Sequence, residues 1–339
     1  MQWIIPVLLV LLILLRWVPS IIERFRPFPY LISLIGLAWV PALAYAIVCA
    51  LLGWVAPAWV SCAIALWGLS LRAGYVRNIF RKTDSKKPQL SCMTLNCRFG
   101  RADADHIVST VRDQSVDILA LQEVTDDLIT RLKASGIEEL LPYCQLGQAR
   151  EGDNGGFNAL FSNIKPSATF DRIILDYPGA QLPSMQFSIS GLGTVAAFSV
   201  HPKSPMRSRK DRLHGLSILS TLPGVYISTK DESRAEEYFP LTLVMGDLNA
   251  TLDTKFVRRW QREEGELKDA AFALGKSSYA SFPSWTAVPL IELDHILYRI
   301  VADAPEAGDS IRNFRVRRVK NIAITNTDHL AIVSSFVWN

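Results

Sequence analysis

The chain has 339 residues, 49% of them hydrophobic, and a formal net charge of +4. Its five cysteines are odd in number and scattered, which argues against a disulfide framework and fits a reducing compartment. These averages hide a sharp boundary, because residues 1–71 carry only four charged side chains, Arg16, Glu23, Arg24 and Arg26. From residue 72 onward the composition is that of an ordinary soluble domain, long enough for one large core.

The first 71 residues predict a membrane-embedded region of about three helices. Residues 29–53 form an uncharged stretch long enough to cross a bilayer, which needs roughly 20 apolar residues. Residues 54–71 are a second, shorter candidate. Residues 4–15 are a third, which reaches bilayer length as residues 2–22 if Arg16 snorkels to the interface, with a re-entrant or interfacial helix as the alternative. A cleaved signal peptide fits less well, since no basic region precedes this segment.

Positive charge predicts how this multi-pass region is oriented. With three spans, the segment between the first two spans and the soluble domain lie on the same side of the membrane. That side carries all the Lys and Arg residues near the spans, which are Arg16, Arg24, Arg26, Arg72, Arg77, Arg81, Lys82, Lys86 and Lys87. The positive-inside rule therefore predicts a cytoplasmic domain, with an outward-facing domain as the alternative. Residues 72–88 are expected to be a basic linker, either solvated or lying on anionic headgroups.

Beyond this linker, strand and helix patterns alternate. Strand patterns cover residues 90–95, 116–121, 159–162, 167–175, 185–189, 194–200, 241–245, 291–298, 314–324 and 331–338. Helix patterns cover residues 103–112, 125–134 and 211–222, and Thr125 is the expected N-cap of the second helix. The mixture predicts an α/β or α+β domain with a layered core.

Polar side chains stand where many of these strands end. The most informative stretch is Gly246-Asp247-Leu248-Asn249-Ala250, which follows the buried strand at 241–245. A carboxylate and a carboxamide in this place can hold a water, a metal ion or a phosphate oxygen, although each alone is more often a turn residue. Further candidates in chain order are Asn96, Gln122, Glu123, Asn158, His201, Asp294, Asp328 and His329, and we expect the set to converge on one edge of the sheets.

This ordered set resembles the endonuclease/exonuclease/phosphatase superfamily over roughly residues 89–339. The segment Ser281-Phe282-Pro283-Ser284-Trp285, just before Asp294, fits the same resemblance. The resemblance implies a four-layer β-sandwich of two sheets flanked by helices, here preceded by transmembrane helices. It also implies a metal-dependent phosphoesterase that uses Mg²⁺, with Mn²⁺ as a substitute, because a hard cation relieves the charge repulsion between a phosphoester and its nucleophile.

The resemblance also implies metal-binding and nucleophile-activating roles for individual residues. Glu123 would bind Mg²⁺, Asn96 would assist directly or through water, and Asp328 is a candidate further ligand. Asp247 would align or deprotonate the attacking water, while Asn249 would hold the phosphate.

The histidines and the basic residues complete the predicted site. His329 would contact the phosphate, Asp294 would orient that imidazole, and His201 would lie near the phosphate or the leaving group. Asn158 is a candidate for substrate binding. Lys203 and Arg207, which follow His201, are candidates for holding a polyanionic substrate or a membrane surface. His106, His214 and His295 receive no catalytic role.

The resemblance leaves the substrate open, since this fold serves many reactions. The first hypothesis is hydrolysis of a phosphodiester or phosphoanhydride in a lipid headgroup or lipid diphosphate, supported by the membrane segment. The second is a membrane-tethered nuclease acting on DNA or RNA, supported by the basic residues after His201. The third is a non-catalytic interaction module, which the retained set of metal and base residues disfavours. The expected partners are membrane lipids and a phosphate-containing lipid or nucleic acid.

Overall fold

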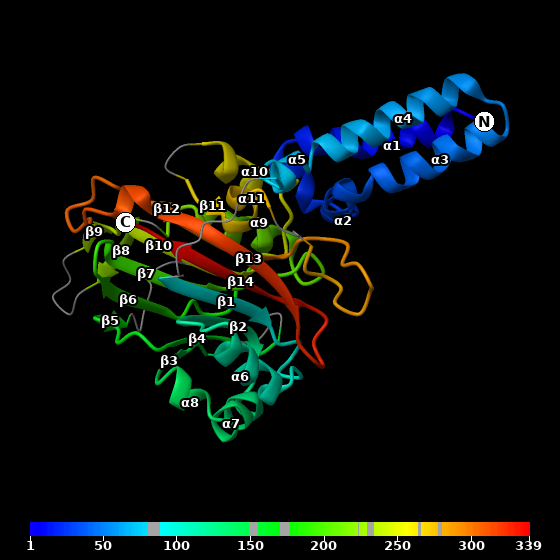
Figure 1. Ribbon diagram of the computed structural model, residues 1–339. Helices are drawn as coiled ribbons and strands as arrows, with labels where there is room; N and C mark the ends of the chain where they lie inside the picture. The colour runs from blue at the N-terminus through cyan, green and yellow to red at the C-terminus, as the bar shows by residue number, and fades with distance from the viewer. Residues whose placement is uncertain are drawn as a thin grey trace.

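The protein consists of a two-sheet α/β sandwich and a group of N-terminal helices that projects from one side of it (Figure 1). The computed structural model describes residues 1–80, 89–148, 155–169, 177–222, 224–228, 234–263, 266–276 and 280–339.

Two mixed six-stranded sheets form the sandwich. The first has the strand order β13 (Arg315–Ala323), β14 (Leu330–Val337), β1 (Leu90–Asn96), β2 (Ile118–Val124), β4 (Phe157–Ser162) and β3 (Tyr143–Leu146). The second has the order β11 (Lys268–Asp269), β12 (Asp294–Ile300), β10 (Leu241–Asp247), β7 (Gly193–Val200), β6 (Ser184–Ile189) and β5 (Ala168–Thr169). A separate hairpin joins β8 (Gly224–Ser228) to β9 (Arg234–Tyr238).

The strand directions explain why the polar strand ends meet. In the first sheet β1 and β2 are parallel, and Asn96 stands opposite Gln122 at their carboxyl ends. In the second sheet β7 and β10 are parallel, so their carboxyl ends also share one edge. The neighbouring strands β12 and β14 run antiparallel and therefore begin at that edge, where Asp294 pairs in register with Asp247. One edge of the sandwich thus collects side chains from six strand termini.

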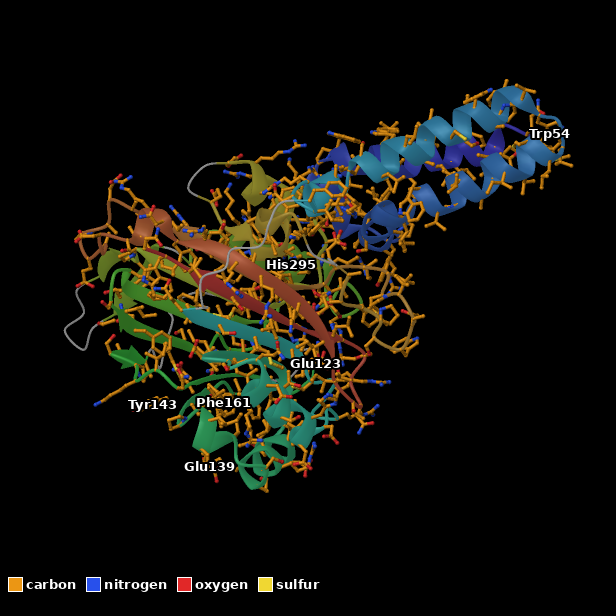
Figure 2. All side chains as sticks on the ribbon, viewed as in Figure 1. Trp54, Glu123, Glu139, Tyr143, Phe161 and His295 are labelled. Atoms are coloured by element: carbon orange, nitrogen blue, oxygen red, sulfur yellow. The ribbon has the colours of Figure 1, made fainter. Side chains whose placement is uncertain are left out.

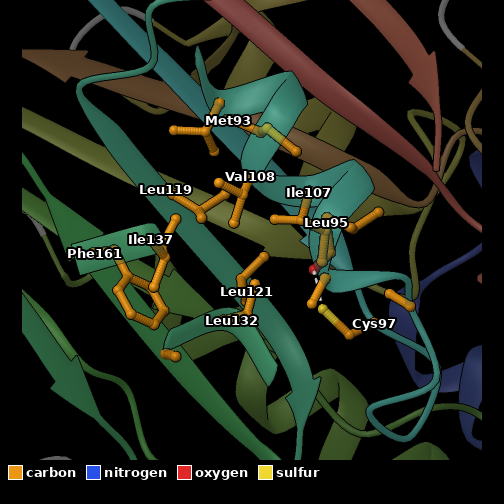
Figure 3. Packing of buried hydrophobic residues seen from close by; sticks show 14 of the residues in the cluster. Met93, Leu95, Cys97, Ile107, Val108, Leu119, Leu121, Leu132, Ile137 and Phe161 are labelled. Atoms are coloured by element: carbon orange, nitrogen blue, oxygen red, sulfur yellow. Dashed lines mark hydrogen bonds between the residues drawn. The ribbon is translucent and has the colours of Figure 1, made fainter. Parts of the chain in front are cut away.

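Helices cover both outer faces, which completes the four layers. Side chains alternate along each strand, so one set packs between the sheets and the other packs against helices. On the first sheet, Leu119 and Leu121 meet Ile107 and Leu132 of the covering helices α6 (Ala104–Asp113) and α7 (Asp126–Ala134), beside α8 (Ile137–Leu140) (Figure 3). On the second sheet the covering helices are α9 (Arg209–Leu219), α10 (Lys255–Arg262) and α11 (Ala270–Leu274). The predicted layered sandwich is confirmed.

Most expected elements are found, with shifted limits. The Thr125 side chain accepts a hydrogen bond from the backbone N–H of Leu128, as expected of an N-cap. The strand expected over 291–298 instead begins at Asp294, because Ile291 pairs with Phe282 in an isolated bridge and is thereby held away from β10. Of the strand expected over 167–175, β5 covers two residues, and residues 170–176 lie outside the described part. The sequence patterns missed β3, the β8–β9 hairpin, α10 and α11.

The N-terminal helices form their own small core. Helices α1 (Ile4–Leu14), α3 (Trp39–Leu51) and α4 (Val55–Ser70) run side by side away from the sandwich, with Trp54 at the far end (Figures 1 and 2). Ile13, Ala42 and Ile64 are buried between them, while large apolar side chains cover the outside. Within the described residues no single helix has both the length and the apolarity of a membrane span. The pair Phe28–Leu37 and Trp39–Leu51 meets that test together, but it is bent by 62°.

The bend interrupts the continuous span expected over residues 29–53. Helix α2 (Phe28–Leu34) and a 3-10 turn end just before α3. Pro41 lies in the first turn of α3, and its ring conflicts with a helix that continues back through residue 37. Gly36 lies in the 3-10 turn against the guanidinium of Arg72, where a Cβ atom would overlap that group. Local chain chemistry therefore favours a break here, and the contact with Arg72 requires a residue without a Cβ at position 36.

The described part of the expected linker differs from a solvated tether. Residues 72–80 include α5 (Ala73–Val76), and Arg72 and Tyr75 are buried. The Tyr75 ring meets Phe272 of α11 edge to face at 5.4 Å, and Asn78 donates its backbone N–H to the Gly275 carbonyl. This segment therefore packs against the sandwich. Residues 81–88 of the expected linker lie outside the described residues.

Candidate active site

One amide side chain joins two carboxylates at the shared edge of the sheets. Asn96 Nδ2, at the end of β1, donates to Glu123 Oε1 at 3.2 Å and to Asp247 Oδ2 at 3.0 Å. Glu123 comes from the first sheet and Asp247 from the second, and all three residues are nearly or fully buried. The amide therefore holds together two carboxylates that repel each other when both are ionised.

The backbone turns sharply at two of these residues. Glu123 and Asn249 have φ angles of 54° and 49°, a left-handed conformation that residues with a Cβ seldom adopt. Local hydrogen bonds hold both turns. The backbone N–H of Phe99 donates to Glu123 Oε2 at 3.0 Å, and that of Asn249 donates to Asp247 Oδ1 at 2.7 Å. Asn249 Nδ2 donates to the Pro202 carbonyl at 3.0 Å.

Two buried histidines flank Asp247. Nδ1 of His329 lies 2.7 Å from Asp294 Oδ2, and its Nε2 lies 3.9 Å from Asp247 Oδ2. Nε2 of His201 lies 3.6 Å from Asp247 Oδ2 and 3.9 Å from Glu123 Oε1. Because the carboxylate of Asp294 only accepts when ionised, Nδ1 of His329 carries a proton and Nε2 points toward Asp247.

These contacts shift the pKa values of the cluster in opposite directions. Burial favours the neutral form of His329, but Asp294 and Asp247 outweigh it and raise its pKa to about 10. Burial also opposes ionisation of Asp247, yet contact with His201 and the charge of His329 hold its pKa well below the usual range. For Glu123, burial dominates and raises the pKa despite His201 and Asn96. Asp247 is therefore the more readily ionised of the two carboxylates.

The donor set at this edge fits a hard divalent cation. Glu123 and Asp247 present carboxylate oxygens a short distance apart in a buried site, and a cation would offset their charge. Asp247, Asp294 and His329 also place ligand atoms within 4.8 Å of one another. We favour Glu123 as the anchor, because Asp294 already accepts from His329 and Mg²⁺ prefers oxygen to imidazole nitrogen. The Asn96 side chain directs Nδ2 toward the two carboxylates, and its Oδ1 accepts a hydrogen bond from the Arg98 backbone N–H.

The structure brings seven of the predicted residues into this cluster, namely Asn96, Glu123, His201, Asp247, Asn249, Asp294 and His329. Gln122 lies in the polar chain beneath the cluster, and the remaining four lie differently. Asp328 is next to His329, but its carboxylate faces Arg98 Nε at 3.6 Å. Asn158 is fully buried in β4 and donates to the Gln181 carbonyl, while its Oδ1 has no hydrogen-bond partner among the described residues. Lys203 pairs with Asp211 at 3.4 Å, and Arg207 is exposed.

A buried polar chain fixes the two sheets beneath the site. Thr94 Oγ1 donates to Gln122 Oε1 at 3.2 Å, and Gln122 Nε2 donates to Ser199 Oγ at 3.1 Å. Ser199 then donates to the Leu121 carbonyl, back in the first sheet. Because Gln122 precedes Glu123 and β7 pairs with β10, this chain links the strand that carries Glu123 to the neighbour of the strand that carries Asp247.

Two residues without a predicted role hold the loop that carries Asn249. Arg212 is fully buried, and its Nε donates to the Asn249 carbonyl at 2.8 Å. His295 donates from Nε2 to the Ala250 carbonyl and from Nδ1 to Asp269 Oδ2, both at 2.9 Å. The helical spacing of Arg212 with Leu216 and Leu219 places it on the buried face of α9, a signal present in the sequence.

The N-terminal segment reaches this loop through buried ion pairs. Arg212 Nη1 pairs with Glu23 Oε2 at 2.9 Å, so one guanidinium contacts both the N-terminal segment and the Asn249 carbonyl. Asp253, four residues after Asn249, pairs with Arg16 at 2.9 Å and with Arg72. Their burial shows that the N-terminal segment docks beside the loop that follows β10, at the edge of the second sheet that carries Asp247.

A comparison of the sequence with profiles of protein families agrees with this architecture. A profile of the endonuclease/exonuclease/phosphatase family matches residues 93–310, which is more than half of the chain. The chain belongs to the endonuclease/exonuclease/phosphatase family. Membership makes it a hydrolase of the nuclease and phosphatase group, whose members typically depend on a divalent metal. Comparison with curated protein sequences gave no match.

Solved structures share the fold at low sequence identity. A conserved Enterococcus faecalis protein of unknown function is 16% identical, with a TM-score of 0.51 over 74% of this chain and 100% of its own. Humanised TDP2 from D. rerio is 17% identical, with a TM-score of 0.51 over 73% and 98%. D. rerio TDP2 complexed with a single-strand DNA product is 18% identical, with a TM-score of 0.51 over 75% and 100%.

Proposed function

We propose that this protein is a membrane-anchored, Mg²⁺-dependent phosphoesterase that hydrolyses a phosphodiester or phosphoanhydride of a lipid. The observation that carries the proposal is the buried cluster in which Asn96 joins Glu123 to Asp247, with His329 and His201 beside the second carboxylate. Metal-assisted hydrolysis needs such a set, which combines oxygen ligands, an ionised carboxylate for water and proton donors for phosphate oxygens.

Each residue has a definite task in this proposal. Glu123 would hold the cation, which would supply positive charge to offset that of the phosphate and so lower the barrier to attack by water. Asp247, kept ionised by its neighbours, accepts a hydrogen bond from that water and aligns it. His329, held by Asp294, and His201 donate to phosphate oxygens as negative charge develops there. The Asn249 side chain joins them once it turns from the Pro202 carbonyl toward the phosphate.

The outer surface of the N-terminal helices supports the membrane anchor. Large apolar side chains are exposed along α1, α3 and α4, whereas soluble domains seldom leave contiguous apolar surface of this extent in water. At 1.5 Å per residue, the 16 residues of α4 span about 24 Å, which is short of the roughly 30 Å bilayer core. We therefore propose that α1, α3 and α4 insert into the membrane together, with the catalytic domain on the cytoplasmic side by the positive-inside rule.

A membrane-tethered nuclease is the second candidate. Lys203, Arg207, Arg209 and Lys210 follow His201, and a basic segment beside the site suits a polynucleotide. D. rerio TDP2, which shares this fold, is known in complex with a single-strand DNA product, so the fold can serve a nucleic-acid substrate. The pairing of Lys203 with Asp211 weakens this candidate, because it offsets one of the charges. A non-catalytic membrane module is the third, disfavoured by the complete cluster.

One parallel assay tests all three. Full-length protein in non-ionic detergent is incubated with Mg²⁺ or with EDTA on a polyprenyl diphosphate, a sphingomyelin-like phosphodiester and supercoiled plasmid. Asp247→Ala serves as the inactive control. We expect Mg²⁺-dependent release of phosphate or headgroup that the variant lacks. Plasmid nicking lost in the same variant would support the nuclease, and no turnover of any substrate would contradict the proposed phosphoesterase.

A further inference from the structure

A cavity lies between the N-terminal segment and the catalytic domain, away from the catalytic cluster. It measures about 190 Å³. Ser20, Ile21 and Arg24 line it from the 3-10 turn η2 (Ser20–Arg24), and Lys210, Leu213 and His214 line it from α9. Phe256 of α10 closes one side. Two segments almost 190 residues apart therefore build one pocket.

The polar part of this cavity is basic. Arg24, Lys210 and His214 are exposed around it, and none of its lining residues is acidic. Within the described part of the chain, no carboxylate pairs with Arg24 or Lys210. The backbone carbonyl of Arg24 accepts from Arg209 Nε at 3.0 Å, which brings a further guanidinium to the same place. Such a set attracts a phosphate group, and partial enclosure reduces the screening of that attraction by salt.

The remaining walls are apolar. Ile21, Leu213 and Phe256 face the cavity beside the basic groups. Inorganic phosphate would use only the basic side, since it has no apolar part to bury. A ligand that combines a phosphate with the start of a hydrocarbon chain would use both.

The place of the cavity in the molecule agrees with an amphiphilic ligand. Turn η2 follows α1 in the chain, and α9 contacts η2 at the base of the projecting helices (Figure 1). If α1, α3 and α4 enter a bilayer, this base lies at the level of the headgroups, where anionic lipids attract each Lys or Arg.

We infer that this cavity binds the headgroup of an anionic phospholipid, an inference that rests on the proposed membrane anchor. The phosphate contacts Arg24, Lys210 and His214, and the glyceryl and first acyl carbons lie against the apolar wall. The lipid is a structural ligand here and not the substrate, because the cavity lies apart from Asp247 and its partners.

Occupation of the cavity has a consequence for the catalytic loop. Turn η2 also carries Glu23, and α9 carries Arg212, whose guanidinium pairs with Glu23 and donates to the Asn249 carbonyl. A lipid that contacts both elements adds to the contacts that keep this pair closed. Bound lipid therefore stabilises the docked arrangement of the N-terminal segment and the loop that carries Asn249.

The test measures binding of soluble short-chain lipids to the full-length protein in non-ionic detergent. The probes are dihexanoyl phosphatidylglycerol, dihexanoyl phosphatidylcholine, glycerol 3-phosphate and a short oligonucleotide. Binding of each probe is measured by calorimetric titration, and its effect on stability by thermal unfolding. We expect phosphatidylglycerol to bind best and to raise the Tm. Each basic group at a lipid surface contributes about fivefold in affinity, so Arg24→Ala with Lys210→Ala should weaken binding roughly 30-fold.

The matched control is Arg26→Ala with Lys255→Ala. Both residues are exposed and basic, both lie close in sequence to the cavity residues, and neither lines the cavity. This pair loses the same charge but leaves the lining of the cavity unchanged, so we expect it to bind phosphatidylglycerol like the wild type. His214→Glu, which introduces a negative charge at a third exposed position in the lining, should weaken binding as the Arg24/Lys210 pair does.

Several results would overturn the inference. Equal weakening in the control pair would mean that net charge alone attracts the lipid. Equal affinity for glycerol 3-phosphate would mean a soluble anion site, and tighter binding of the oligonucleotide would mean a nucleic-acid site. The proposed activity fails separately, through absence of Mg²⁺-dependent hydrolysis. Stabilisation by phosphatidylglycerol without hydrolysis would leave the lipid site standing while the phosphoesterase proposal fell.

Discussion

The N-terminal helices and the sandwich are both rich in apolar residues, but they place them differently. Residues 1–80 expose 27 large hydrophobic side chains, whereas the much longer described part of residues 89–339 exposes six. The sandwich buries its apolar side chains between its own layers, because two sheets and their helices supply facing surfaces. Three short helices cannot do this for one another. The comparison teaches that the same composition can build a core or an attachment surface, depending on how many layers are available to cover it.

Metal removal should have the largest effect, and only on the chemistry of the sandwich. Chelation by EDTA should lower the hydrolytic rate by about three orders of magnitude, since the cation offsets the charge that Glu123 and Asp247 bring to the phosphate. Added Mg²⁺ or Mn²⁺ should restore the rate. Flotation with vesicles should not change, because the N-terminal helices hold none of the proposed ligands. Full activity in EDTA would contradict the metal assignment.

Replacing Asp247 should have the second-largest effect, which should again be confined to the hydrolytic rate of the sandwich. Asp247→Asn keeps the shape of the side chain but removes the charge that aligns water, so hydrolysis should fall about a thousandfold. The rate is measured with saturating Mg²⁺, and circular dichroism checks the fold. Asp303→Asn, at an exposed surface carboxylate paired with Arg312, is the control and should retain the wild-type rate. A loss of less than tenfold in Asp247→Asn would contradict the assigned role.

The junction between the regions can be broken at Arg212. Arg212→Met leaves the Glu23 carboxylate buried without its ion-pair partner, which should cost about 3–5 kcal/mol in free energy of unfolding. Glu23→Leu combined with Arg212→Met removes both charges and should recover much of that loss. Denaturant unfolding measures both variants. Additive losses in the double variant would mean that the two side chains do not interact.

The pH dependence of the free energy of unfolding should reveal that His295 is buried in its charged form. Its two nitrogens face the Asp269 carboxylate and the Ala250 carbonyl, both acceptors, so the imidazolium donates twice. Burial lowers its pKa, but Asp269 and the Ala250 carbonyl outweigh burial and raise it above the usual value. A raised folded-state pKa contributes stability that is fully present below the unfolded value of about 6.5 and is lost as pH rises through the folded value.

His295→Leu should therefore cost more stability in mildly acidic solution than in alkaline solution. We expect a loss of about 1–3 kcal/mol near pH 6, as for an unsatisfied buried partner, and a smaller loss near pH 9. His214→Leu, at an exposed position on α9, is the control for loss of an imidazole outside such a buried pair. A loss for His295→Leu that grows as pH rises would contradict the charged form.

The smallest effect on folding and catalysis should come from the exposed face of the helices. Trp59 and Leu66 of α4 are 73% and 68% exposed. Trp59→Ser with Leu66→Ser should leave the denaturant midpoint and the rate on soluble substrates within error, but weaken vesicle partitioning at least tenfold, because both side chains would lose apolar burial. Unchanged partitioning would contradict the proposed anchor.

Local sequence chemistry determined much of this protein. Apolar runs predicted most strands of both sheets, and Thr125 marked a helix start, because these features depend on neighbours along the chain. The strand-end positions of Glu123, His201 and Asp247 were visible in the same way. The marked drop in charge before residue 72 likewise separated the helices from the sandwich.

Tertiary structure alone decided how distant parts meet. The start of β12 at Asp294 depends on the pairing of Ile291 with Phe282, and the close approach of Arg72 to Gly36 joins residues 36 positions apart. Glu23 and Arg212 form an ion pair although they are 189 residues apart in the sequence, and no local pattern encodes such a contact. Periodicity along a chain reports which face of an element is buried, whereas the partner buried against that face is set by packing between elements.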